Sequence, residues 1–358
     1  MNNGIIKKFG KVISKYSYIF ITILILIAYV FIVNATGKHF NWGHISSILG
    51  SQNTCIVGIM AIGMAMVVIT GGIDLSLGSS LVVCTGVCIM VYNVTNSVAL
   101  MILSALLTGA LCGLINGLLV GYIKMPPFIA TLGTQLIYRS LMLSVVREID
   151  AKISGSGSSQ FMLIKDTPAY ELLRFKFGNG KLDLGVINIP YITLVLAIMI
   201  ALFVVISKKT KFGKQVYAVG SNATAAKLAG INVERTKCIV YTVTGALVGI
   251  ASILQACKIG NITPASSGVS YEMYAVIACV LGGINMAGGR GEILGVAFGA
   301  ISYSAVSTII VSIPGLSVDI QDAFQGLVLI VVILIQLVGP MIKEKLRQIK
   351  KKKEALQG

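Results

Sequence analysis

The stretch VVITGGIDLSLGSSLVV, residues 67–83, ends one apolar run at two glycines, places a single aspartate, and then continues as a second apolar run. Asp74 is the only acidic residue in the first 147 positions. A carboxylate at the depth of a bilayer costs about 3 kcal/mol or more unless it has partners. Gly71 and Gly72 therefore predict a break between two helices, at which the aspartate finds hydrogen-bond donors.

Two roles fit this aspartate. As a helix cap it would accept hydrogen bonds from the backbone N–H groups of residues 76 and 77, with Ser76 assisting. As a functional carboxylate it would anchor a broken helix at a gate or at a subunit contact. The roles are compatible, and the sequence leaves both open. The broken-helix motif as a whole comprises Gly71, Gly72, Asp74, Ser76 and Gly78.

The composition is that of a membrane protein. Of the 358 residues, 56% are hydrophobic and 12% are charged, whereas a soluble domain has about 25% charged residues. Apolar runs of about 20 residues, long enough to span a bilayer as helices, recur along the chain. We interpret the first as a retained helix and not as a cleaved signal peptide. The apolar segments are 17–35, 46–70, 76–92, 97–122, 127–145, 190–207, 237–257, 271–286, 291–312 and 320–341. The sequence predicts an all-α polytopic membrane protein, a single domain over 1–358 with about ten transmembrane helices.

The charge distribution predicts the orientation. The net charge is +16, and the basic residues gather in the first 15 positions, in 208–237 and in the tail 342–358. Ten crossings place all three flanks on one side, which the positive-inside rule makes cytoplasmic. Both termini are then cytoplasmic, and the nearly neutral loop 146–189 lies outside. The flanks attract anionic lipid, and nucleic-acid binding is disfavoured because no aromatic residues interleave with the charges.

Several classes of site are disfavoured. The seven cysteines form no CxxC pair and only two histidines exist, so we expect no metal site and no His-based catalysis. The glycine-rich stretch 288–295 lacks the Lys-Ser/Thr pair of a P-loop. The charged residues in the apolar segments are scattered along the sequence, which predicts no catalytic cluster. They are Asp74, Arg139, Glu272 and Asp322. GGIDLSLG at 71–78 echoes GGINMAGG at 282–289, and the helix count places both breaks on one side of the membrane.

Four ordered motifs carry a resemblance to a known family. They are TGGIDLSLGS (70–79), NGLLVGYIKMPPFIATLGTQLIYRS (116–140), TKFGKQVYAVGSNATAAKLAGINVERTK (210–237) and LGGINMAGGRGEILG (281–295). Together they resemble the ribose-type permease family of ATP-binding-cassette (ABC) sugar importers, within the branched-chain and ribose permease superfamily. Two features depart from its pattern: GGIN stands where members more often have Gly-Gly-Thr-Ser, and the loop 146–189 is long.

The resemblance implies a fold like that of the cobalamin-importer (type II) permeases, in a bacterial cell (inner) membrane. It implies a permease dimer with a second copy or a sister permease, a cytoplasmic ABC ATPase subunit that binds ATP and Mg²⁺, and an extracytoplasmic sugar-binding protein. This chain itself would hold no cofactor. The substrate would be a monosaccharide, ribose or a similar pentose or hexose.

The loop 208–237 is the expected contact of the ATPase. TAAKLAGI at 224–231 is typical of a short amphipathic helix that docks in a groove of a partner. Alternatively the loop meets only lipid headgroups. The coupling residues are Gly213, Gly220, Asn222, Ala225, Ala226 and Gly230, of which Gly220, Asn222 and Gly230 would set the turns. A glycine turn is a second expected contact of the ATPase, with weaker support from the sequence. It contains Gly282, Gly283, Gly289, Arg290 and Gly291.

Polar residues inside apolar segments either line a pathway or bond helix to helix, and we favour the second. They are Gln52, Asn53, Asn116, Thr131 and Gln135. Two other functions stay open. One is an ion-coupled secondary sugar transporter in which Asp74 carries the coupling, and the other is a non-transporting membrane protein that recruits a cytoplasmic partner through 208–237.

Overall fold

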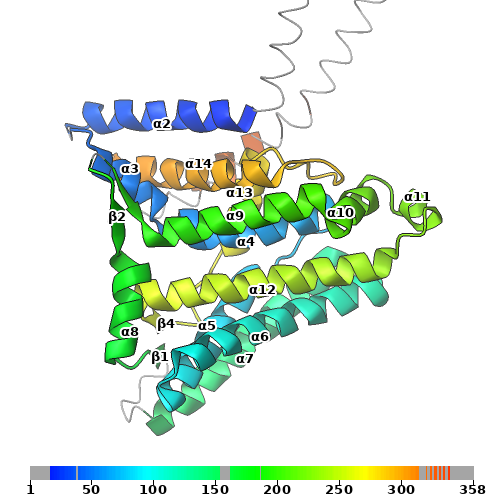
Figure 1. The fold of residues 1–358 in the computed structure, drawn as a ribbon, viewed down its shortest axis with the longest axis horizontal. Coiled ribbons are helices and arrows are strands. Elements are labelled where there is room, and N and C mark those ends of the chain that lie inside the picture. Colours follow the sequence, from blue (N-terminus) through cyan, green and yellow to red (C-terminus); the bar gives the residue numbers. More distant parts are fainter. Residues whose placement is uncertain are drawn as a thin grey trace, which may run out of the picture.

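The computed structural model describes residues 17–37, 39–153, 162–185 and 187–313, and single positions between 320 and 338. Long helices lie side by side, with α2 along one edge and α6 and α7 along the other (Figure 1). Within the described ranges, eight helical segments are long and apolar enough to cross a membrane. The long helix of each segment is, in chain order, α2 (Ser17–Ala35), α4 (Gln52–Ile69), α5 (Leu77–Thr95), α6 (Val98–Gly117), α7 (Pro127–Ile153), α9 (Tyr191–Lys209), α12 (Val233–Ile259) and α14 (Ile293–Ser312).

The described helices confirm an all-α polytopic membrane protein and differ from the ten expected spans in two places. Segment 271–286 is α13 (Tyr271–Leu281), whose 11 residues are about 16 Å long and cover only half of a hydrocarbon core of about 30 Å. Segment 46–70 contains two helices, α3 (Trp42–Leu49) and α4. Most of 320–341 and all of 342–358 lie outside the described residues.

Local capping explains the second difference. Gly50 ends α3, and the Ser51 hydroxyl accepts a hydrogen bond from the Thr54 N–H at 3.0 Å, which starts α4. From Thr54 to Ile69 every residue of α4 is buried, so this helix is the centre of the core. Contacts with α9, α12, α13 and α14 surround it.

The two ends of the helical layer differ (Figure 1). One end carries α10 (Lys211–Ser221) and α11 (Ala223–Leu228), and we call it the α10–α11 face. Contacts of Tyr18 and Lys208 with Glu292 place the start of α2, the end of α9 and the start of α14 at this face. The start of α2 and the 208–237 loop therefore share one face; the basic residues of the first 15 positions lie outside the described residues.

The opposite end, which we call the α8 face, carries the elements described in loop 146–189. They are β1 (Met162–Leu163), α8 (Pro168–Leu173), the π-helix η2 (Arg174–Asn179), β2 (Lys181–Asp183) and β3 (Asn188–Pro190). β2 and β3 form an antiparallel hairpin, and β1 pairs antiparallel with β4 (Asn261–Ile262).

Two side chains fasten this loop to the helices. The Tyr170 hydroxyl donates to the Ala256 carbonyl at 2.8 Å, and burial raises the pKa of Tyr170 to about 12, so the donor proton is retained at neutral pH. Lys258 Nζ donates to the Gly50 carbonyl at 2.9 Å and lies 3.5 Å from the Gly178 carbonyl. The described part of the loop is thus packed onto α12; the serine-rich 154–160 lies outside the described residues.

Glycines bring α6 and α12 into backbone contact. On α6 and its π-helical extension η1 (Leu118–Tyr122), glycines recur at every fourth position: Gly109, Gly113, Gly117 and Gly121. A Cβ atom on any of them would collide with the α12 backbone, whose own Gly245 faces Gly109 and Gly113. Small residues at this spacing let membrane helices approach closely.

A non-helical segment connects α12 to α13. After β4 at the α8 face, residues 263–270 run inward until Gly268 meets Gly78 at the start of α5. A Cβ on Gly78 would overlap the Gly268 carbonyl oxygen. Because α13 covers only half of the membrane, this contact lies inside the membrane layer.

Candidate functional site

Three of the motifs singled out in the sequence meet at the α10–α11 face. The Gly289 N–H donates to the Ile69 carbonyl at 2.8 Å, which joins the glycine turn to the end of α4. Gly220 lies at the same point, because a Cβ on it would overlap the Ile69 carbonyl oxygen and lie 2.8 Å from the Gly289 nitrogen. We call this contact of Ile69, Gly220 and Gly289 the junction. It places the beginning of the 71–78 break and the 282–289 turn on one face, as the helix count predicts, whereas Gly78 lies deeper, against Gly268.

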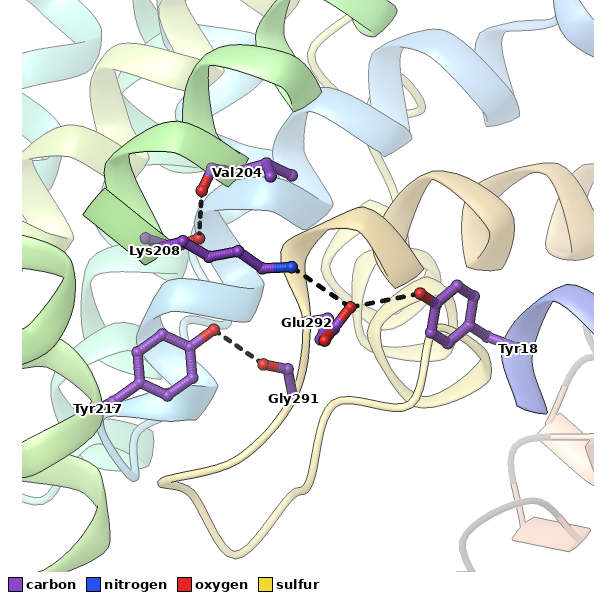
Figure 2. A network of polar contacts seen from close by, with 7 residues as sticks. Tyr18, Val204, Lys208, Tyr217, Gly291 and Glu292 are labelled. Atoms are coloured by element: carbon purple, nitrogen blue, oxygen red, sulfur yellow. Dashed lines mark hydrogen bonds and ion pairs between the residues drawn. The ribbon is translucent and has the colours of Figure 1, made fainter. Parts of the chain in front are cut away.

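A polar network extends the junction to two further helices (Figure 2). The Tyr217 hydroxyl donates to the Gly291 carbonyl at 2.8 Å, which fixes α10 to the glycine turn. Glu292 Oε2 lies 3.6 Å from Lys208 Nζ on α9 and accepts from the Tyr18 hydroxyl on α2 at 3.4 Å. Burial, and secondarily the Glu292 charge, raise the pKa of Tyr217, so it remains a donor at neutral pH. These contacts connect α10 to α2, to α9 and to the start of α14.

The short helix expected in 224–231 is present as α11. The Asn222 side chain accepts from the Ala225 N–H at 2.9 Å and caps the helix, and Gly230 ends it with a φ of +81°. Ala226 is buried, whereas Leu228 is 86% exposed. An exposed leucine on a capped, protruding helix is typical of a docking element.

Two coupling-loop glycines serve packing and not turns. Gly220 lies within α10 and not at the turn predicted for it, because the helix continues to Ser221 and needs a residue without Cβ beside Ile69. Gly213, in the first turn of α10, lies against the Ile206 and Ser207 carbonyls of α9. In the glycine turn, Gly282 ends α13 against Gly295 of α14.

The remaining glycine-turn residues lie at the surface of the α10–α11 face or beside it. Gly283 and Gly289 have φ values of +78° and +71°, which favour glycine. Gly291 supplies the carbonyl that Tyr217 contacts, and Arg290 is exposed beside it. Arg290 is thus placed where a partner on this face can reach it.

Asp74 lies in a buried polar network. Its Oδ1 accepts from the Ser76 N–H at 2.9 Å and from the Ser76 hydroxyl at 2.7 Å. Asn116 of α6 donates to the Ser76 Oγ at 2.7 Å and lies 3.5 Å from Asp74, and Thr134 of α7 donates to the Asn116 Oδ1 at 2.7 Å. Of the two predicted N–H contacts only that of residue 76 is present. The N-cap position of α5 is Ser76, so Asp74 forms a turn just before the helix and does not cap it, and the network ties the break to α6 and α7. Gly72 and Gly78 are buried beside it, and Gly71 is exposed with a φ of +83°.

The other polar residues predicted for a pathway have different surroundings. Thr131 Oγ1 accepts from the Leu75 N–H at 3.1 Å and holds the same break, so Asn116 and Thr131 bond element to element. Gln52 Nε2 donates to Gln255 Oε1 of α12 at 3.3 Å, and Asn53 is half-buried next to it. Gln135 Nε2 donates to Glu272 Oε1 of α13 at 3.4 Å.

Metal binding has no support among the described residues, where no group of three or more His, Cys, Asp or Glu side chains is placed to hold an ion. The seven cysteines are unpaired and buried. Their positions in the helices are those of small packing residues.

Substitutions of Asp74 separate its charge from its hydrogen bonds. We expect Asp74→Asn to keep the fold and at least half of the transport rate, because the amide oxygen still accepts from Ser76. Asp74→Ala leaves buried donors unpaired and is expected to destabilise the protein by about 1–3 kcal/mol. Thermal unfolding in detergent and uptake assays measure both. Loss of transport in a stably folded Asp74→Asn variant would show instead that the charge is required.

Comparisons with known proteins agree with this geometry. Residues 45–333 match the family described as branched-chain amino acid transport system / permease component. The galactose/methyl galactoside import permease protein of Escherichia coli (strain K12) is 30% identical over 307 residues, 82% of this chain and 85% of that protein. The xylose transport system permease protein of Haemophilus influenzae is 32% identical over 339 residues, which are 83% of this chain and 89% of that protein.

A third relative, the fructose import permease protein of Rhizobium meliloti, is 34% identical over 288 residues, 80% of this chain and 75% of that protein. No solved structure matches the chain. The cobalamin-importer likeness of the fold thus stays a prediction, while the relatives confirm the resemblance to sugar permeases.

Proposed function

Since this chain belongs to the permease-component family of the branched-chain amino acid transport systems, and is a transport permease and not an enzyme, we propose that it is the membrane subunit of an ABC importer. The substrate is a monosaccharide. ATP hydrolysis takes place in a partner subunit, and a solute-binding protein delivers the sugar. Two permease chains, identical or sister copies, enclose the pathway.

The protruding helix α11 is the observation that carries this proposal. It stands at the face that bears the basic segment 208–237, its Leu228 is exposed, and the junction behind it ties α10 to α4 and the glycine turn. An ATPase docked on α11 would therefore act directly on the helix breaks. We place this face in the cytoplasm of a bacterial cell, both termini on the same side, and the α8 face with loop 146–189 outside.

The class of sugar follows from the relatives. Those named above import galactose, xylose and fructose, which are two hexoses and one pentose. A pentose or hexose, with ribose among the candidates, therefore fits this chain. The ion-coupled carrier gains no support, because Asp74 is already bonded to Ser76 in a network that holds a helix break.

Co-purification tests the proposal. The chain is solubilised gently from its native membranes, and the sample is assayed for stoichiometric partners and for ATP hydrolysis. We expect an ATPase subunit and a sugar-binding protein whose ligand names the substrate. A chain that purifies alone, without ATPase activity, would contradict the proposal.

A substitution on α11 tests the docking surface itself. Leu228→Asp is expected to reduce the amount of co-purified ATPase at least tenfold, because a charge replaces an apolar contact residue. The matched control is Leu184→Asp, an exposed leucine at the opposite face, which should retain the ATPase. Equal retention by both variants would place the ATPase contact elsewhere.

A further inference from the structure

Two charged residues that look scattered in the sequence lie together inside the membrane layer. Arg139 of α7 donates through Nη1 to the Pro264 carbonyl at 2.6 Å and to the Ser267 carbonyl at 3.2 Å, so it holds segment 263–270. One turn earlier on α7, Gln135 donates to Glu272 in the first turn of α13. The prediction of scattered charges is wrong here. We call Gln135, Arg139 and Glu272 the inner polar site.

The carboxylate of this site is incompletely bonded. Glu272 is 8% exposed, and its Oε2 is buried without a partner in full hydrogen-bond geometry, although the backbone N–H groups of Gly78 and Glu272 lie close to the carboxylate. A Cβ on Gly78 would lie 2.6 Å from this oxygen, so the α5 backbone closes the site on one side. A buried carboxylate oxygen without a donor is costly and rare in native structures. Glu272 Oε2 can therefore accept a further hydrogen bond from a donor that enters the site.

The chemistry of the three side chains matches hydroxyl groups. A sugar hydroxyl both donates and accepts, a carboxylate accepts, a guanidinium donates, and an amide does both. A bare cation is less well suited, because the positive charge of Arg139 already acts on the Glu272 carboxylate. Gln135 Nε2, which donates to Glu272, and Arg139 Nη1, which donates to carbonyls of segment 263–270, could each donate to a sugar hydroxyl oxygen instead.

We propose that the inner polar site binds hydroxyl groups of the monosaccharide during its passage, with Glu272 Oε2 as the principal acceptor. This inference rests on the proposed function and goes beyond it, because it gives the permease its own part in sugar discrimination. Arg139 has a second part: while it holds the carbonyls of Pro264 and Ser267, segment 263–270 stays packed against α7. Sugar hydroxyls that engage Arg139 would release that segment, which leads to the α8 face.

The test uses the complete complex of permease, ATPase and binding protein in proteoliposomes. Radiolabelled D-galactose, D-xylose, D-fructose and D-ribose are the probes, followed by deoxy analogues of whichever sugar is carried. Glu272→Gln and Gln135→Ala are compared with the wild type and with Thr85→Val. Thr85 is a matched control because it is buried on α5 and its hydroxyl bonds only to its own helix, at the Leu81 carbonyl.

We expect uptake per ATP hydrolysed to fall at least tenfold in Glu272→Gln and Gln135→Ala, while ATPase stimulation by the loaded binding protein stays within twofold. Discrimination between the sugar and one deoxy analogue should shrink in the same variants and persist in Thr85→Val. Unchanged uptake, or uptake and ATPase stimulation lost together in folded protein, would overturn the inference. If Glu272→Gln does not fold, Gln135→Ala decides. Absence of ATP-dependent uptake in the wild type would instead contradict the proposed function.

Discussion

Gly220→Ala is expected to reduce ATP-driven sugar uptake at least tenfold. The added methyl group would overlap the Ile69 carbonyl oxygen, which accepts the Gly289 hydrogen bond. To remove this overlap, α10 must move away from α4. The junction then opens, and α11 loses its fixed position. Inserting a group into such a contact costs about 1–3 kcal/mol. Uptake in proteoliposomes and the thermal unfolding temperature measure the two effects.

Gly133→Ala provides the matched control for this substitution. Gly133 also lies in a helix, but nothing stands within 4 Å of the position that its Cβ would occupy. The same chemical change should therefore leave uptake within twofold, with a small gain from helix propensity of up to about 1 kcal/mol. Similar losses in the two variants would mean that the junction has no special role.

Gly113→Val is expected to cause the largest loss of stability. Its side chain would collide with the Tyr241 carbonyl and with Gly245, where α6 and α12 touch backbone to backbone. Both helices are long, so separation at one point disturbs the contacts of the neighbouring glycines as well. We expect a destabilisation of about 3 kcal/mol or more, seen as a lower unfolding temperature and as poor recovery from detergent.

Gly133→Val separates this steric effect from the general cost of valine in a helix. That exposed position has room for the side chain, so only the propensity difference remains, at most about 1 kcal/mol. A Gly113→Val protein that unfolds at the wild-type temperature would contradict the close contact of α6 and α12.

Local patterns predict much of this architecture. The apolar runs give the long helices, the glycine pair at 71–72 gives the break between α4 and α5, and Asn222 and Gly230 bound α11. Each of these features depends on neighbouring residues in the chain. The Gly50–Ser51 break between α3 and α4 was readable in the same way, as a stop glycine followed by a capping serine, but it lies inside a run that is apolar on both sides.

Other features depend on contacts between distant segments. The glycines at 109, 113, 117 and 121 are visible in the sequence, but their spacing does not say which helix they face. Gln135 and Glu272 are 137 positions apart, and only the inward course of segment 263–270 places α13 beside α7. For the same reason the sequence pattern predicts a turn at Gly220, whereas in the structure this glycine allows α10 to contact Ile69.

The energy source of transport is the most direct measurement of the central claim. The purified complex is reconstituted into vesicles, with the loaded binding protein outside. ATP is enclosed in the lumen, on the side of the α10–α11 face, and ionophores collapse every ion gradient. The account predicts that labelled monosaccharide enters only when ATP is present and that the ionophores leave uptake unchanged. Uptake that ignores ATP and stops when the ion gradients collapse would identify an ion-coupled carrier and contradict the account.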